Sequence, residues 1–308
     1  LRDDDRVLVG RAGHPRAPIE IERGLLNVGY DAASGIFSLK PSTLHWGASS
    51  ATLAGEARRG VLEGADAWQF DIASSGGVMA APEFAVAPVP IEAWTTRGAW
   101  WPERDIVRLD GLDIRAGSTG FNMSGEISVS AARPGVRLQA KLGEANSDVL
   151  KAIWPPFIAP RTRTWVGKRI ESGSLKSLAW NFESGIFHTP DAAGPAHEKS
   201  SLTIETGPAV FRPERRLPPL ATPRALVQVE NDALELSMPE ATMTLPSGKT
   251  LGFKSVRMTS TDVLRDPADA ELSFRSQADV APVLELLAME PIAVVAAVDP
   301  VKLQLQGK

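Results

Sequence analysis

The most constraining feature of the sequence is a two-residue alternation of apolar and polar side chains between residues 225 and 259. Val227 and Val229, for example, alternate with the polar residues Gln228 and Glu230. Because successive side chains of a strand point to opposite faces, this spacing predicts strands with one buried face. Asn231-Asp232 is typical of a tight turn between two such strands. The candidates for the buried face are Val227, Val229, Leu234, Leu236, Met243 and Leu245.

The same alternation recurs in other parts of the chain. It covers residues 106–142, with turn sequences at Gly117-Ser118 and Pro134-Gly135, and it appears in shorter form at residues 19–22 and 68–72. Strands that follow one another with short turns form antiparallel meanders. The sequence therefore predicts a mainly β fold with few helices.

Helical signals are confined to three short segments. Ser147-Asp148 is a predicted N-cap for a helix that Pro155-Pro156 must end. Pro160 suits the first turn of a second helix that reaches about Ile170, and Asp279 suits the cap of a third helix near residues 279–289.

These signals divide the chain into three regions. We predict a first β-repeat region at residues 1–145 and a short helical segment with a Trp-Pro-Pro bend at residues 146–172. A second β-repeat region at residues 173–308 would be closed by the third helix. An order of strand and then helix occurs at residues 136–154 and again at residues 270–288, which suggests a weak internal repeat.

The composition excludes several functional classes. The net charge of −4 lacks the basic excess of nucleic-acid-binding domains, so we expect no nucleic-acid partner. The chain has no cysteine, which excludes disulfides, thiolate metal sites and a cysteine nucleophile. No apolar run approaches the roughly 20 residues that a membrane-spanning helix needs. Because the chain opens with Leu1, we expect it to be a segment of a longer protein.

No catalytic or metal-binding signature is found. The stretch at residues 117–120 is one residue short of a Gly-x-Ser-x-Gly nucleophile elbow, and that at 248–250 lacks the upstream glycine of a phosphate loop. His188 and His197 flank a loop without a third ligand at a recognised spacing, which favours a solvated loop over a metal site. We therefore predict no catalytic residue, no cofactor and no metal, and we expect a protein that is not an enzyme.

Two clusters leave alternatives open. Trp94, Trp100 and Trp101 fit either a stacking platform for carbohydrate or ordinary packing. A group of basic residues lies on the predicted second helix: Arg161, Arg163, Lys168 and Arg169. These residues fit either a contact with acidic lipid headgroups or a solvated helix face.

The segment at residues 152–166 resembles a motif of the large AsmA-like envelope proteins, in particular their YhdP-like branch. It reads Ala-Ile-Trp-Pro-Pro-Phe-Ile-Ala-Pro-Arg-Thr-Arg-Thr-Trp-Val. The residues that carry the resemblance are Trp154, Pro155, Pro156, Ala159, Pro160, Arg163 and Trp165.

The resemblance implies a fold, a location and a function. The fold would be an extended, twisted antiparallel sheet curled into an apolar groove or half-barrel. The protein would lie in the periplasm, tethered to the inner membrane by an anchor outside this chain. It would be a passive conduit for phospholipid between the inner and outer membranes, and its partners would be phospholipid acyl chains and the remaining repeats of the full-length protein.

Two interpretations of the apolar face remain open. In a conduit, the six alternating residues from Val227 to Leu245 would line the groove, and acyl chains would cover them at a gain of roughly 0.8 kcal/mol per buried methylene. The alternative is a closed β-sandwich that acts as a binding or scaffold module of the cell envelope and binds glycan through its tryptophans. In that case the same six residues would be plain core.

Overall fold

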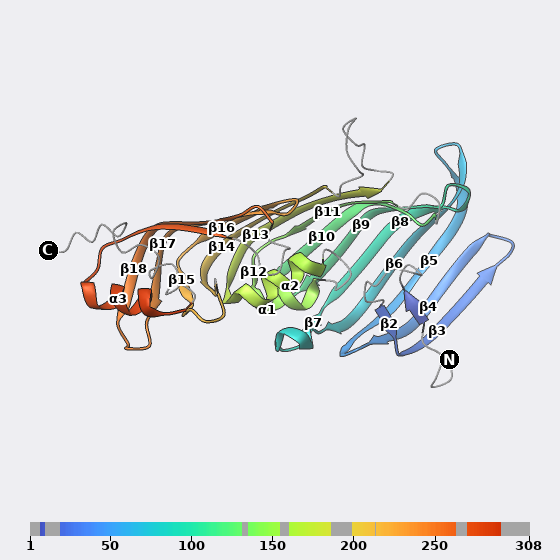
Figure 1. Ribbon diagram of the computed structural model, residues 1–308. Coiled ribbons are helices and arrows are strands. Elements are labelled where there is room, and N and C mark those ends of the chain that lie inside the picture. Colours follow the sequence, from blue (N-terminus) through green and yellow to red (C-terminus); the bar gives the residue numbers. More distant parts are fainter. Residues whose placement is uncertain are drawn as a thin grey trace, which may run out of the picture.

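The computed structural model describes residues 7–9, 19–130, 135–154, 160–185, 199–212, 214–262 and 270–290. The fold is mainly β: one large antiparallel sheet carries three short helices (Figure 1). This confirms the predicted fold class.

The large sheet is built mostly from long strands that follow one another along the chain, whereas the first two strands pair with each other in a separate two-stranded sheet. The strands before the helical segment are β1 (Val7–Val9), β2 (Ile19–Ile21), β3 (Arg23–Asp31), β4 (Ile36–Trp46), β5 (Ser49–Leu62), β6 (Ala65–Met79), β7 (Val89–Ile91), β8 (Ala93–Trp101), β9 (Ile106–Ala116), β10 (Thr119–Ser128), β11 (Gly135–Leu142) and β12 (Ala145–Asn146). The strands after it are β13 (Ile170–Gly185), β14 (Lys199–Phe211), β15 (Leu220–Thr222), β16 (Ala225–Glu230), β17 (Ala233–Thr244), β18 (Thr250–Ser260) and β19 (Glu271–Ser276).

The helices are α1 (Ser147–Ile153), α2 (Pro160–Arg169) and α3 (Val280–Ala288), and there are 3-10 turns at η1 (Pro82–Phe84) and η2 (Pro102–Arg104). Their positions agree with the predicted helical segments. The predicted cap of α1 is wrong: the N-cap is Asn146, whose side chain accepts a hydrogen bond from the Val149 N–H, and Ser147 and Asp148 already lie in the helix. Asp279 is the N-cap residue of α3, but its side chain makes no capping hydrogen bond.

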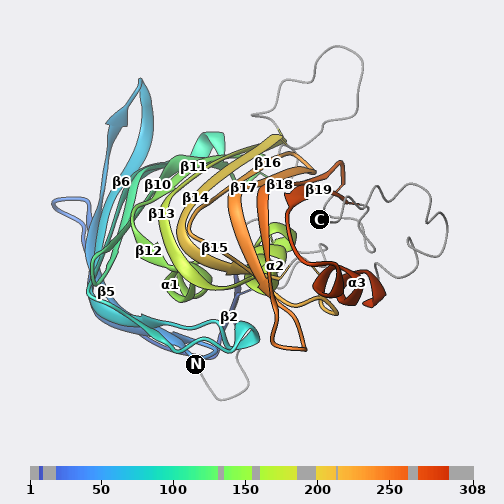
Figure 2. The ribbon, with the colours of Figure 1, turned by 90° about the vertical axis from the view of Figure 1, so that its left-hand side faces the viewer.

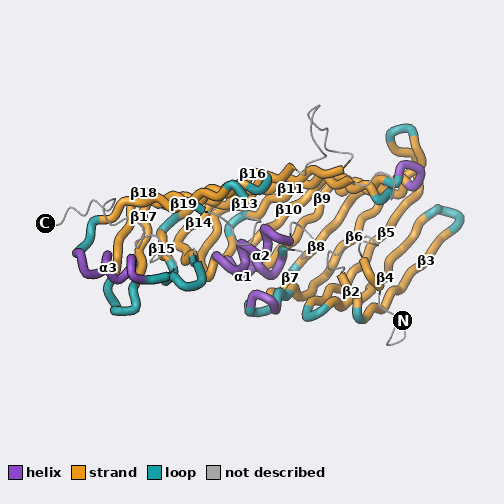
Figure 3. The backbone as a smooth tube through the Cα atoms, viewed as in Figure 1, coloured by secondary structure: helices purple, strands orange, loops and turns teal. Residues whose placement is uncertain are grey.

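The pairing pattern is that of a meander in which three long strands, β6, β13 and β14, each pair with two successive strands along one edge. β7 and β8 both pair with β6, β11 and β12 both pair with β13, and β15 and β16 both pair with β14. β13 pairs with β11 on one side and β14 on the other, so the two predicted repeat regions belong to one sheet. β3 and β18 lie near opposite ends of the elongated molecule (Figure 3). Seen from one end, the sheet is curled, and α1 and α2 lie on its concave side (Figure 2).

The turns follow their local sequence. Asn231 adopts a positive φ of 56° between β16 and β17, and Gly248 adopts a φ of 83° between β17 and β18. Asn tolerates the left-handed region better than most residues, and glycine enters it freely. The tight turn predicted at Asn231-Asp232 is therefore confirmed.

The cross-strand register aligns the alternating apolar residues into rows that cross the sheet. Row A consists of Val28, Leu39, Gly55, Ile72, Thr96, Leu112, Met123, Ala140, Trp180, Leu202, Val229 and Leu234. Row B, one pleat away, consists of Ser42, Leu53, Ser74, Trp94, Ile114, Phe121, Leu142, Leu178, Ile204, Val227, Leu236, Met258 and Leu272. Directly opposed residues of an antiparallel pair share a face, so both rows lie on one face of the sheet.

The opposite face of the sheet is charged. It carries cross-strand ion pairs between Arg137 and Glu183, at 3.0 Å, and between Arg257 and Glu235, at 2.8 Å. Both pairs are well exposed, so each contributes little to stability. Their significance is that this face is compatible with water, whereas rows A and B are not.

The core lies on the concave face and is unevenly filled. Leu150 of α1, Val166 of α2 and Leu286 of α3 belong to one buried cluster with the row residues of β10–β18. We call β10–β18 the packed half and β3–β9 the open half. Along row A the exposed fraction falls from 55 % at Val28 to 2 % at Leu202, so protein covers the rows in the packed half and much less in the open half.

Candidate functional site

The open half presents apolar side chains that nothing in the described residues fully covers. Tyr30 and Phe37, which face each other across β3 and β4 one pleat from row A, are 56 % and 43 % exposed. Their rings lie 5.3 Å apart, and Phe37 meets Trp68 edge-on at 6.1 Å. An exposed apolar surface of this kind marks a place where another molecule can bind.

The polar members of the rows in the open half each make a hydrogen bond to a neighbouring group. Ser42 donates to the Lys40 carbonyl at 2.7 Å, and Ser74 donates to the Gly76 carbonyl at 2.8 Å. Thr96 accepts a hydrogen bond from the indole N–H of Trp94 at 2.5 Å. The face therefore offers a ligand hydrocarbon contact rather than free hydroxyl groups.

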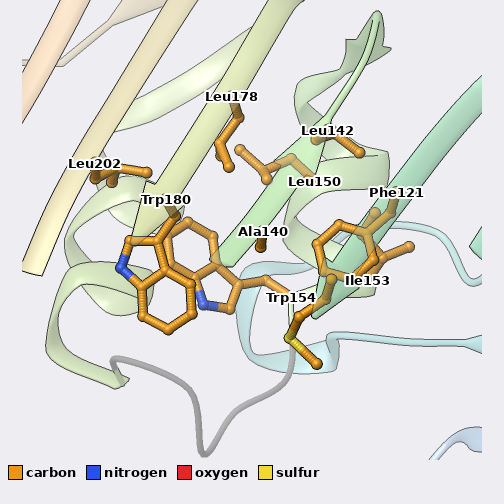
Figure 4. A pocket seen from close by; sticks show the side chains of 10 residues that line it. Phe121, Ala140, Leu142, Leu150, Ile153, Trp154, Leu178, Trp180 and Leu202 are labelled. Carbon is orange, nitrogen blue, oxygen red and sulfur yellow. The ribbon is translucent and has the colours of Figure 1, made fainter. Parts of the chain in front are cut away.

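A small apolar cavity lies where rows A and B pass beneath α1 (Figure 4). Its volume is about 30 Å³, and ten side chains from β10, β11, α1, β13, β14 and Trp154 line it without exposing any polar surface. Ala140 forms part of its floor, and Trp154 and Trp180 lie on one side (Figure 4). The cavity lies in the packed half, and its β10 residues are next to β9, the last strand of the open half.

The helical segment above this cavity is tied to the open half by Arg163. The guanidinium donates Nε–H to the Trp154 carbonyl at 2.8 Å and pairs through Nη1 with Glu83 Oε1 at 2.5 Å. It also stacks on the Phe84 ring, with Cζ 4.7 Å from the centroid. Gly167, one turn along α2, leaves the space that this ring occupies. We call Arg163, Glu83 and Phe84 the clamp, because they join α2 to η1, which precedes β7.

A second buried cation, Lys151, lies on α1. Its side chain is almost fully buried and reaches the Glu171 carbonyl at 3.4 Å, which is a weak hydrogen bond. Burial lowers the pKa of Lys151 from its ordinary value of 10.5, and the carboxylates of Asp148 and Glu171 oppose this shift. The folded state thus carries a cation that is poorly solvated.

We expect Lys151→Met to raise the free energy of unfolding by about 1 kcal/mol near pH 7, because an apolar side chain avoids this desolvation. The unfolded chain holds the lysine proton more tightly than the folded protein does. Burial of the charged Lys151 therefore destabilises the wild type fully at pH values below the folded pKa, and this destabilisation fades as the pH rises toward 10.5. Urea unfolding at several pH values should show the stability gap between variant and wild type shrinking with pH. Lys141→Met is the control, because Lys141 is exposed on β11. A gap that widens with pH would contradict the assignment.

The six candidate lining residues are brought together on one face. Their exposed fractions lie between 0 and 4 %, and all belong to the main buried cluster of the packed half: Val227, Val229, Leu234, Leu236, Met243 and Leu245. The open part of the apolar face is formed by other residues, such as Val28, Leu39 and Ile72, which the alternation at residues 225–259 did not single out.

The motif residues are only partly described. Trp154 lines the cavity, Arg163 forms the clamp, and half-buried Trp165 packs against the main core. Pro160 begins α2, whereas Pro155, Pro156 and Ala159 lie outside the described residues.

Of the basic cluster on α2, the side chain of Arg161 lies outside the described part of the structure, and the other three side chains do not form one surface. Arg163 is buried in the clamp, Arg169 donates a hydrogen bond to the Arg212 carbonyl at 3.5 Å, and Lys168 is exposed. The three neighbouring tryptophans are also separated. Trp101 is 3 % exposed and donates to the Leu62 carbonyl, while Trp100 points to the opposite face of β8 and is 41 % exposed. These positions do not make a joint stacking platform.

Two negative observations apply to the described ranges alone. Within them, no group of three or more His, Asp or Glu side chains is arranged to hold a metal ion, and no helix is long and apolar enough to cross a bilayer. His188 and His197 lie outside those ranges, and His45 is exposed on β4.

The comparisons with other proteins leave the family open. The resemblance of residues 152–166 to the AsmA-like motif therefore stays a prediction. No protein-family model, no curated protein and no solved structure matches this chain.

Proposed function

We propose that the concave face of the open half binds the hydrocarbon chains of phospholipid. The observation that carries this proposal is row A, which is apolar at nearly every strand from β3 to β17 while its exposed fraction rises to 55 % at Val28. A row of this kind loses free energy when water covers it, and acyl chains are the ligands whose shape and polarity fit a long apolar surface.

The energetics favour a passive carrier. Each methylene that leaves water contributes roughly 0.8 kcal/mol, so a partly buried acyl chain is held without a polar anchor. Contact with a continuous apolar row is also non-directional, so the chain can slide from one strand to the next without breaking hydrogen bonds. We therefore propose a conduit rather than an enzyme.

The resemblance of residues 152–166 to AsmA-like proteins supports the cellular part of the proposal. On this basis the chain is a periplasmic segment of a protein that is anchored in the inner membrane, and it passes phospholipid between the two membranes of a Gram-negative envelope. The remaining repeats of that protein would be its structural partners.

The proposal predicts that a charge on the concave face of β8 removes bound lipid. Thr96 and Thr95 are neighbouring, half-buried threonines on opposite faces of β8, which makes them a matched pair. Thr96→Glu places a carboxylate in row A between Ile72 and Leu112, and its contact with hydrocarbon should lower bound phospholipid at least about tenfold. Native mass spectrometry and lipid extraction of the purified chain give the measurement.

Thr95→Glu adds the same charge on the polar face and should retain the lipid of the wild type. Thermal unfolding of both variants checks that the sheet is intact. Equal loss of lipid in the two variants, or a wild-type chain that neither copurifies with phospholipid nor binds a fluorescent phospholipid, would overturn the proposal.

A further inference from the structure

The cavity beneath α1 matches hydrocarbon better than water in the polarity of its lining. About 30 Å³ is room for a water molecule, but a buried water needs two to four polar partners and this lining exposes no polar surface. An apolar cavity without polar partners stays dry, and its walls lose the contacts that a filling group would restore. The end of a hydrocarbon chain is the group that matches both its size and its polarity.

The position of the cavity links it to the open half. Its floor includes Met123 and Ala140, which are successive members of row A, and Phe121, which belongs to row B. The preceding member of row A, Leu112 on β9, is half-buried and belongs to the open half. A hydrocarbon chain that lies along row A in the open half and extends past Leu112 would therefore next contact the residues that line the cavity.

Beyond the cavity the path is closed by protein. Trp180 and Leu202 form the far wall of the cavity, and the next members of row A, Val229 and Leu234, are only 2 % and 3 % exposed. The clamp ties α2 to η1 and so holds the helical segment over the sheet. A chain end that enters the cavity has no further room along the row.

We propose that this cavity is the binding site for the methyl end of an acyl chain, and that it selects acyl chains by length. This inference rests on the proposed function, because the rest of the acyl chain lies on the open half. α1 and the two indoles of Trp154 and Trp180 then act as the stop against which the chain end packs.

The test combines a change in the cavity with a change in the ligand. Ala140→Val fills the cavity from its floor, and Gln139→Val, at an exposed position on the opposite face of β11, is the control. The probes are palmitoyl and myristoyl lysophosphatidylcholine below their micelle concentrations, titrated by isothermal calorimetry. Thermal unfolding of each variant shows that it is folded.

The wild type should bind the palmitoyl ligand more tightly by about fourfold for each of the additional methylenes. In Ala140→Val this preference should fall by about fourfold, the contribution of the one hydrocarbon group that fits the cavity, while Gln139→Val should keep it. A palmitoyl preference that is unchanged in Ala140→Val would overturn the length-selecting site and leave the proposed function standing. Absence of binding by either ligand to the wild type would overturn both.

Discussion

Replacing Val227 by aspartate is expected to unfold the packed half of the protein. Val227 is fully buried in row B, between Ile204 and Leu236 in register. An aspartate at this place must either bury its charge or take up a proton, and neither form finds a polar partner in the row. Burying the aspartate costs several kcal/mol of the free energy of unfolding, which is only about 5–15 kcal/mol for a typical domain. Circular dichroism during heating, together with limited proteolysis, measures the loss.

The control for Val227 is its neighbour Gln228, which is exposed on the opposite face of β16. Gln228→Asp should change the free energy of unfolding by less than about 1 kcal/mol, as surface substitutions usually do. A folded Val227→Asp variant with the stability of the wild type would show that water reaches row B in the packed half. In that case the residues from Val227 to Leu245 would line an open groove and would not be core.

Removing the guanidinium of Arg163 is expected to be the next most damaging change. Arg163→Met keeps much of the apolar stem but loses the charged hydrogen bond to the Trp154 carbonyl, the ion pair with Glu83 and the stacking on Phe84. Hydrogen bonds from charged donors and cation–π contacts are each worth about 1–3 kcal/mol, and because they are not additive we expect a total loss of about 2–3 kcal/mol. Chemical denaturation gives this loss, and hydrogen exchange of the α2 amides shows whether the helix is released.

Lys168 is the matched control on the same helix, since its side chain is exposed. Lys168→Met should leave both stability and hydrogen exchange near the wild-type values. Equal effects of the two substitutions would mean that the clamp does not hold α2. High salt should weaken the clamp only slightly, because Arg163 is 8 % exposed and buried charges are poorly screened.

The local structure of this chain is largely predictable from its sequence. The alternation at Val227 and Val229 depends only on the pleat of a strand, and the turn at Asn231 depends only on tolerance of a positive φ. The helix limits at Pro160 and near Asp279 also follow from local chemistry. The cap of α1 was misplaced by one residue, because Asn146, Ser147 and Asp148 are all good capping residues and sequence does not rank them.

What covers the apolar face is not predictable in the same way. Alternation gives Val28 and Val229 the same pattern, yet one is 55 % exposed and the other 2 %, because the helices pack over only one end of the row. The clamp joins Arg163 to Glu83, far apart in sequence, through a pairing order that no local signal encodes. Burial of an arginine between a glutamate and a phenylalanine is visible only after the sheet is assembled.

The register of rows A and B has a consequence for how such a protein can change in length. Each of the long strands that form row A contributes one residue to it, and these long strands pair with one another in their chain order. Duplicating or deleting one hairpin would therefore lengthen or shorten the apolar surface by about 10 Å, twice the strand spacing, without shifting the register elsewhere. Loss of a single strand would reverse the chain direction and break the order. The length of the apolar surface can therefore change in steps of one hairpin.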